Sequence, residues 1–177
     1  MDEQQRFWAA GRAPAQTTTR RTVRIRSRLP LALLGLLLLN QIFNPARIWV
    51  GLMLGLGVLV LFCYLWARAL SRGLDGQRTV RGAWVVAGDL LAEQFTVANA
   101  AALPALWVEV LDRSNLPGYR PDWVAFVGVN ERQSYPAQGR CQHRGVFTLG
   151  PWELHSGDPL GLFEAVVTYP DSRSILV

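Results

Sequence analysis

The sequence predicts a membrane helical hairpin of two transmembrane α-helices, followed by an all-β, immunoglobulin-like antiparallel sandwich. Two apolar segments, residues 29–43 and 48–67, are separated by a short turn and flanked by arginines. From residue 79 onward, short runs of β-forming residues alternate with turn residues. We therefore expect four regions: a basic, largely disordered tail (1–28), a transmembrane hairpin (29–67), a basic juxtamembrane linker (68–78) and a sandwich domain (79–177).

The second apolar segment is long enough to cross a bilayer, whose core of roughly 30 Å requires roughly 20 apolar residues in a helix. Residues 48–67 carry no charge, and Trp49, Tyr64 and Trp66 lie near their ends, where aromatic rings favour the headgroup layers. The first segment spans about 22 Å as a helix, so its flanking arginines must reach the headgroups to complete the crossing. Asn44 and Pro45 suit a tight turn between the two helices.

Arginines near the two segments predict their orientation. Seven precede the first segment, four lie between residues 68 and 81, and the turn contains only Arg47. Cytoplasmic flanks carry the excess of positive charge, so we expect a multi-pass protein of the inner (cytoplasmic) membrane with its N-terminus and β-domain in the cytoplasm. A signal peptide is the alternative for the first segment, although a convincing cleavage site is missing. A first segment that fails to cross would reverse the orientation.

Small residues mark one face of the second segment. Gly51 and Gly55 form a G-x-x-x-G step, which lets helix backbones approach closely in lipid. Two interpretations remain open: the hairpin packs on itself there, or the step is a face for a homo-oligomer or another membrane subunit.

The distribution of charge excludes nucleic acid as the expected partner. The net charge of the chain is +5, but from residue 82 onward ten acidic residues outnumber six arginines. The basic residues therefore flank the membrane segments, where anionic lipid attracts them, and the domain lacks the basic face of a nucleic-acid-binding protein. Cys63 and Cys141 are expected to be free thiols, without metal-ligand spacing.

The sandwich prediction depends on eight candidate strands and their separators. The strands are expected over residues 79–87, 94–99, 105–112, 123–130, 139–148, 152–155, 165–169 and 174–177. Turn residues between them include Gly88-Asp89, Gly150-Pro151 and the segment from Ser156 to Gly161. We expect the aromatic rings to fill one core, namely Trp84, Trp107, Trp123, Phe126, Phe147 and Phe163.

The order of these features resembles the N-terminal half of a bacterial and archaeal membrane-protein family catalogued as domain of unknown function fifty-eight. The specific part is the pair of motifs R-G-x-F-x-L-G-P at residues 144–151 and D-P-x-G-L-F at residues 158–163. The resemblance begins near Arg20 and extends to the last residue. Longer members continue into a further domain beyond this point, so the chain resembles a fragment or a short form.

The resemblance implies a function in assembly. Family members are typically encoded beside MoxR-type AAA+ ATPases and proteins with von Willebrand factor A domains. We therefore expect a non-enzymatic, membrane-anchored protein-interaction module that acts as an adaptor or assembly factor with a MoxR-type ATPase. The alternatives are an accessory structural subunit of a larger membrane complex, and a small-ligand-binding or catalytic sandwich.

No residue set has the pattern of a catalytic, cofactor or metal site. Glu153, His155 and Asp158 are close in sequence, and His143 adds a second imidazole, but metal hydrolases show tighter spacing. We expect these residues to face solvent or to structure turns. Asp158 precedes a proline and has the chemistry of a turn residue, and Arg144 is the expected ion-pair partner of Asp158.

Overall fold

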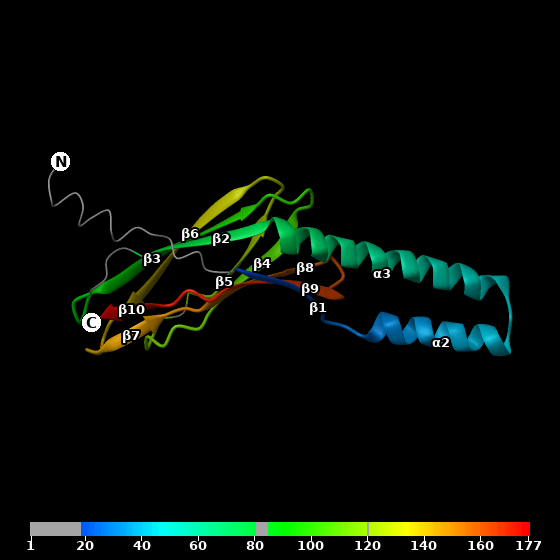
Figure 1. Cartoon of the computed structure of the whole chain (residues 1–177), viewed down its shortest axis with the longest axis horizontal. Coiled ribbons are helices and arrows are strands. Elements are labelled where there is room, and N and C mark those ends of the chain that lie inside the picture. The colour runs from blue at the N-terminus through cyan, green and yellow to red at the C-terminus, as the bar shows by residue number, and fades with distance from the viewer. Residues whose placement is uncertain (1–18, 81–84, 120) are drawn as a thin grey trace.

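The computed structural model describes residues 19–80, 85–119 and 121–177. A β-sandwich lies at one end of the molecule, and two helices project from it side by side (Figure 1). The described elements, in chain order, are β1 (Arg20–Ile25), α2 (Leu29–Phe43), α3 (Arg47–Gly73), β2 (Leu74–Val80), β3 (Leu90–Asn99), β4 (Ala105–Asp112), β5 (Trp123–Val127), β6 (Arg132–Arg140), β7 (Val146–Leu149), β8 (Trp152–Gly157), β9 (Phe163–Tyr169) and β10 (Arg173–Leu176).

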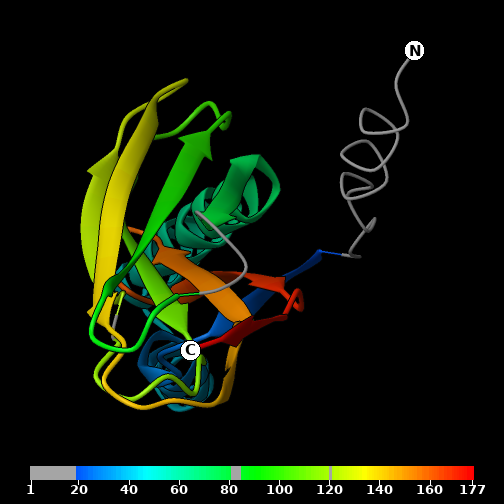
Figure 2. The same ribbon diagram turned by 90° about the vertical axis from the view of Figure 1, so that its left-hand side faces the viewer.

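The strands form two main sheets in which every pairing is antiparallel. The larger sheet has the order β1-β9-β8-β4-β5, the smaller sheet has the order β2-β3-β6, and β7 pairs with β10 as a separate ribbon. Figure 2 views these layers end-on, with the helices behind them. The predicted antiparallel β-sandwich is therefore confirmed.

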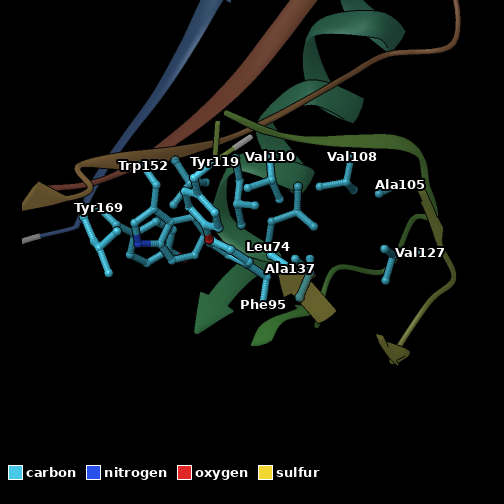
Figure 3. Packing of buried hydrophobic residues seen from close by; sticks show 14 of the residues in the cluster. Leu74, Phe95, Ala105, Val108, Val110, Tyr119, Val127, Ala137, Trp152 and Tyr169 are labelled. Carbon is cyan, nitrogen blue, oxygen red and sulfur yellow. The ribbon is translucent and has the colours of Figure 1, made fainter. Parts of the chain in front are cut away.

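Trp152 lies in the core between the two sheets (Figure 3). Its ring stacks on Tyr169 with 4.1 Å between centroids, and it meets Phe95 edge-on at 5.4 Å. Phe95 belongs to β3 in the smaller sheet, whereas the other two rings belong to β8 and β9 in the larger sheet. A Cβ on Gly76 of β2 would approach the Trp152 ring to 2.6 Å, so glycine is needed there. These aromatic contacts hold the sheets together.

Only part of the expected aromatic core lies in this interior. Phe126 is 51% exposed on the edge strand β5, and Phe163 is buried against α3 rather than between the sheets. Trp107 alternates with the core residue Val108 and therefore lies on the outer side of β4. Two of the expected rings pack at the margin of the core, namely Trp123 and Phe147. Trp84 lies outside the described residues.

The observed strands differ from the expected ones around β6. The strand expected over residues 139–148 is interrupted, because β6 ends at Arg140 and β7 begins at Val146. The sequence pattern does not predict most of β6, which contains Pro136. This strand is at the edge of the smaller sheet, where a proline is tolerated because one side of the strand needs no hydrogen-bond donor. The strand expected over residues 105–112 matches β4.

Two expected region boundaries are corrected. Residues 20–25, expected in the disordered tail, form β1 and pair with β9 along its whole length. Residues 68–78, expected as a linker, contain the end of α3 and the start of β2, so the helix leads directly into the sandwich. The strand expected over residues 79–87 overlaps the end of β2 and then enters residues 81–84, outside the described residues. The rest of the expected tail, residues 1–18, also lies outside them.

Candidate functional site

The surface of the helical hairpin is almost entirely apolar. Large aliphatic and aromatic side chains of α2 and α3 are exposed, with exposures of 79% for Leu29, 68% for Ile42 and 69% for Leu54. Among the described residues, α3 is the one helix long and apolar enough to cross a membrane. The helix α2 is also apolar but has 15 residues. An exposed apolar surface of this extent indicates an interaction surface rather than a face meant for water.

One stripe of α3 provides its packing surface. The less exposed positions recur at steps of three and four residues, the spacing of a single helix face, and include Trp49, Met53, Leu56 and Val60. The same stripe continues as Cys63, Ala67 and Leu70, which are fully buried where the helix reaches the sandwich. The helix therefore uses one face throughout, first toward α2 and then toward the β-domain.

A groove of about 460 Å³ lies between the two helices near their turn. Its lining is largely apolar and consists of Leu36, Leu37, Leu39, Asn40, Phe43 and Trp49. The indole nitrogen of Trp49 is buried and has no hydrogen-bond partner among the described residues. The end of the hairpin is therefore packed less completely than the end that meets the sandwich.

The glycine step of α3 is not used inside the hairpin. A Cβ added to Gly51 or Gly55 would meet no atom within 4 Å, and the same holds for Gly35 and Gly57. Packing of the hairpin on itself through the glycine step is therefore wrong. The small-residue face at Gly51 and Gly55 is open instead.

The last third of α3 packs directly on the sandwich. Cys63 and Ala67 are buried with Phe163 of β9, and Tyr64 meets the Phe163 ring edge-on at 5.6 Å. At the end of the helix, a Cβ on Gly73 would overlap Ala101 in the loop between β3 and β4. The hairpin and the sandwich therefore share one continuous packed interface.

Arg21 connects the first strand to the end of α3. Its Nη1 atom donates to three carbonyl oxygens at the helix end, those of Ser71 (3.2 Å), Arg72 (2.5 Å) and Leu74 (3.0 Å). The last carbonyls of a helix lack partners within it and carry partial negative charge, so a guanidinium is stabilising there. Because β1 leads into α2, Arg21 fixes both arms of the hairpin to the β-domain.

Asp158 organises the turn between β8 and β9, as its sequence context predicts. Its Oδ1 accepts a hydrogen bond from the backbone nitrogen of Phe163 at 2.6 Å, and its Oδ2 accepts one from Leu160 at 2.9 Å. Gly161 has a φ of 68°, which glycine adopts without strain. The turn lies at the helix end of the sandwich, and Asp158 itself is 1% exposed.

The expected ion pair between Arg144 and Asp158 is wrong. Arg144 is exposed in the loop directly before β7. This strand lies at the end of the sandwich away from the helices, whereas Asp158 lies at the helix end (Figure 1). The loop is held by Gly145 and Val177, which exchange backbone hydrogen bonds of 3.0 and 3.1 Å. The strand β7 of the first motif and the turn of the second motif are therefore at opposite ends of the domain.

His155 lies between two glutamates, of which only one is in the expected cluster. Its Nε2 is 3.1 Å from Glu153 Oε2, and its Nδ1 is 3.0 Å from Glu164 Oε1. Ionised carboxylates only accept hydrogen bonds, so both contacts form together when both ring nitrogens carry a proton. Asp158 belongs to its turn instead, and His143 is exposed in the loop before β7.

Glu153, one of the two glutamates beside His155, has a lowered pKa. Burial by itself raises the pKa of Glu153, but the hydrogen bond from His155 and the nearby charge of Arg113 outweigh burial and lower it. Within the described parts of the chain, no three His, Cys, Asp or Glu side chains are placed to hold a metal ion. The chemistry that these residues show is that of a network of ion pairs and hydrogen bonds on the outer face of the sheet.

A second charged cluster is sealed between the sheets. Arg78 of β2 contacts Glu93 of β3 at 2.7 Å and both carboxylate oxygens of Asp112 of β4 at 3.1 and 3.2 Å. The exposures of the three side chains are 9%, 0% and 0%. Tyr119 donates to Glu93 at 2.8 Å, and Ser114 donates to Asp112 at 2.5 Å. Arg78 therefore links the smaller sheet to the larger one.

The pKa values of Arg78 and Tyr119 are both raised in this cluster. Burial by itself lowers the pKa of Arg78, but the hydrogen bond and charge of Glu93 and the charge of Asp112 raise it overall, so the guanidinium stays charged. Burial, and then the charge of Glu93, raise the pKa of Tyr119 far above its usual range, so its hydroxyl stays a donor. The charged guanidinium can therefore hold the two sheets together through Glu93 and Asp112.

Three important charged residues are not predicted as such from the sequence: Arg21, Arg78 and Glu93. The sequence does contain a signal for Glu93, because it lies on the same face of β3 as the core residues Leu91, Phe95 and Val97. A charge at such a position indicates a buried partner. Arg21 and Arg78 lie in arginine-rich stretches, where their neighbours are exposed, so no comparable signal distinguishes them.

Edge strand β5 presents apolar side chains to the outside. Val124 is 65% exposed and Phe126 is 51% exposed. Leu106 of the neighbouring strand β4 and Val129 just after β5 are 41% and 45% exposed. Because β5 is the last strand of the larger sheet, no described strand pairs with the other side of its backbone.

Comparison with known proteins finds no family. No family model matches the chain, and no curated protein matches it. Solved structures of low similarity include the crystal structure of the CARDB domain of a Pyrococcus furiosus protein in complex with di-metal ions, with 12% identity and a TM-score of 0.40 over 59% of this chain and 89% of that one. A solution structure of the same domain has a TM-score of 0.41 and 12% identity over 59% of this chain and 95% of that one.

A third solved structure is the Pseudomonas fluorescens alkylpurine DNA glycosylase AlkC bound to DNA that contains an abasic site analog. Its similarity has a TM-score of 0.38 and 15% identity, over 83% of this chain and 42% of that one. At TM-scores and identities of this size, none of the three structures informs the function of the chain.

Proposed function

We propose that this chain is a non-enzymatic, membrane-anchored protein-interaction module. In this proposal the hairpin α2–α3 is embedded in the cytoplasmic membrane, and the arginine distribution supports a cytoplasmic position for its flanks and the sandwich. The observation that carries the proposal is the apolar surface of the hairpin, where Leu29 and Leu54 are 79% and 69% exposed. A hydrocarbon environment removes the cost of exposing these side chains to water.

The direct connection of α3 to the sandwich supports a positioning role. Arg21 binds the end of α3, and Cys63 and Ala67 pack against Phe163. A domain held in this way presents its surfaces at a defined distance from the membrane. This arrangement suits an adaptor that places a partner, and the sandwich in it is proposed to be of the immunoglobulin-like kind.

The proposed partner is a MoxR-type AAA+ ATPase, which is what the resemblance of residues 144–151 and 158–163 to the domain of unknown function fifty-eight family implies. The exposed side chains of Val124 and Phe126 on edge strand β5 supply a contact surface away from the hairpin. Apolar patches on edge strands are typical sites of protein contact.

The test is partner capture from native membranes. The full chain, carrying a photo-crosslinker at Phe126, is purified in detergent after irradiation, and the crosslinked proteins are identified by mass spectrometry. We expect the ATPase among them. The matched control carries the crosslinker at Val146, which is 68% exposed at the far ribbon. Repeated absence of the ATPase from the Phe126 sample would count against this partner.

A second candidate function is an accessory subunit of a larger membrane complex. The open glycine face at Gly51 and Gly55 favours it, because close helix contact in lipid requires small residues. Recovery of the chain at a fixed stoichiometry with a large assembly would support this function over a transient adaptor. Replacing Gly51 and Gly55 with leucine would then release the chain from the assembly, whereas the pair Leu52 and Leu59 replaced with alanine would not.

A further inference from the structure

We propose that the β8–β9 turn, residues 158–162, and the neighbouring Ile25 insert into the headgroup layer of an anionic lipid membrane. The sandwich then rests on the bilayer as a third membrane contact beside the two helices. This inference rests on the proposed membrane embedding of the hairpin. The surface that this end of the sandwich contacts is the lipid headgroup layer itself.

The bare part of the hairpin is too short to fill a bilayer. The helix α2 has 15 residues, or about 22 Å at a rise of about 1.5 Å per residue. The sandwich contacts α3 from Val60 onward, so the uncovered part of α3 ends near Leu59 and spans about 20 Å. A hydrocarbon core is roughly 30 Å thick. The remaining thickness of the hydrocarbon core therefore has to be spanned by the part of the molecule where the sandwich meets the helices.

On both arms, the base of the sandwich lies beside apolar parts of the helices. On the α3 side, Leu65 is 52% exposed, although Cys63 and Ala67 on the opposite face of the helix are buried against the sandwich. On the α2 side, Arg26 and Ser27 donate backbone hydrogen bonds to the carbonyl oxygen of Leu162 at 2.9 and 3.2 Å. The apolar helix α2 begins two residues later, at Leu29. The β8–β9 turn therefore lies level with the first turn of α2.

The length of α3 that is both apolar and covered by the sandwich is similar to the depth at which interfacial segments lie in a bilayer. From Val60 to Trp66, α3 is covered by the sandwich on one side and apolar on the other. This stretch spans about 9 Å, and interfacial segments are buried by about 5 to 10 Å. A side chain at the tip of the turn, at this level, meets lipid rather than bulk water.

The side chains at this level have the chemistry of a membrane interface. Leu160 at the tip of the turn is 55% exposed, and Ile25 beside it is 53% exposed. Exposed arginines lie on both arms near this level, namely Arg24, Arg26, Arg28 and Arg68. Each basic residue near an anionic surface adds attraction to it. The ribbon β7–β10 lies at the end of the sandwich away from the helices (Figure 1), so in this arrangement its exposed residues stay in water.

The test is the depth of a fluorescent probe in the reconstituted full chain. Single cysteines at Leu160, Ile25, Leu54 and Val146 are labelled with an environment-sensitive dye, and the chain is reconstituted into vesicles of phosphatidylcholine and phosphatidylglycerol. The native thiols of Cys63 and Cys141 are fully buried, so the unmodified chain measures background labelling. Lipids with a quencher near the headgroup, or near the end of the acyl chain, report the depth of each dye.

We expect blue-shifted emission at Leu160 and Ile25, with stronger quenching by the headgroup quencher than by the chain-end quencher. Leu54 is expected to show the reverse order, and Val146 the emission of a dye in water. Water-like emission at both Leu160 and Ile25, with Leu54 still quenched, would overturn the inference and leave the membrane embedding intact. Water-like emission at Leu54 as well would overturn the proposed embedding itself.

Discussion

The hairpin and the sandwich place their apolar side chains in opposite ways. In the sandwich, Phe95 and Leu154 are fully buried between the sheets, whereas in the hairpin Leu29 and Leu54 are among the most exposed large apolar side chains that the structure describes. Charged residues also differ between the two regions. Arg78 is buried inside the sandwich, whereas neither α2 nor the middle of α3 contains a charged residue.

This difference shows which region is stable by itself. The sandwich pairs the buried charges of Arg78, Glu93 and Asp112 with one another and fills its core with its own side chains, so its stability comes from contacts within the chain. The hairpin buries little of its apolar surface within the described chain, so under the proposed membrane embedding its stability depends on lipid. Changes in one region should therefore affect different measurements from changes in the other.

The largest effect is expected from the Arg78→Met substitution. Removing the guanidinium leaves Glu93 and Asp112 buried without a counter-charge, which typically costs about 3 to 5 kcal/mol. Urea unfolding of the full chain in detergent, followed by tryptophan fluorescence, measures the loss. The matched control is Arg113→Met, because Arg113 is 68% exposed in its pair with Glu153 and such pairs contribute about 0 to 1 kcal/mol. Equal losses in both variants would contradict the structural role of Arg78.

A charge in the hairpin is expected to act on membrane insertion instead. Leu54→Asp places a carboxylate near the middle of α3, at a cost of about 2.5 to 3.5 kcal/mol for insertion. The fraction of the chain in washed membranes should fall. Leu90→Asp is the matched control, because Leu90 is 56% exposed on β3 and faces water. A membrane fraction that is unchanged in Leu54→Asp would contradict the difference between the two regions.

A substitution at the connection between the two regions is expected to have a smaller effect than the substitutions within them. Arg21→Gln removes the charged hydrogen bonds at the end of α3, with an expected loss of about 1 to 2 kcal/mol. Amide hydrogen exchange should increase in the last turn of α3 and in β1. Arg24→Gln changes an exposed arginine of the same strand and should leave exchange unaltered. If both variants exchange alike, the cap contributes nothing to the connection.

The smallest effect concerns pH. Because the folded pKa of Glu153 is lowered below its ordinary value of 4.5, the resulting stability is present above about pH 4.5 and lost as the pH falls through the folded pKa. His155→Gln removes the hydrogen bond that lowers this pKa. The stability difference between the native chain and this variant should therefore shrink below pH 4.5 in urea unfolding series. The control His143→Gln, in an exposed loop, should show the native pH dependence.

The antiparallel sandwich could be predicted from the sequence because its central strands alternate cleanly, as Phe95 and Val97 do on β3. Strand β1 could not, because three of its six residues are arginines and its partner β9 lies near the other end of the chain. Strand β2 contains Asp75, Gly76 and Gln77 and lacks an apolar alternation. Its core position depends on Trp152, which needs the space that Gly76 leaves.

The candidate site was predictable where the chemistry is local. The turn role of Asp158 follows from the proline and glycine that accompany it, and the apolar hairpin follows from composition. The contact of His155 with Glu164 depends on the register of β8 against β9, which pairs His155 with Val166. Sequence proximity suggested Asp158 instead. Long-range register of this kind is decided by packing of the whole sheet.

The pairing of β1 with β9 also determines the order in which the molecule can be made. During synthesis, β1 and the hairpin leave the ribosome long before Phe163 to Tyr169, the only strand that β1 pairs with among the described residues. The larger sheet therefore cannot close until almost the whole chain has been translated. Pairing of β9 with β1 is therefore the step that joins the strand before α2 to the rest of the larger sheet.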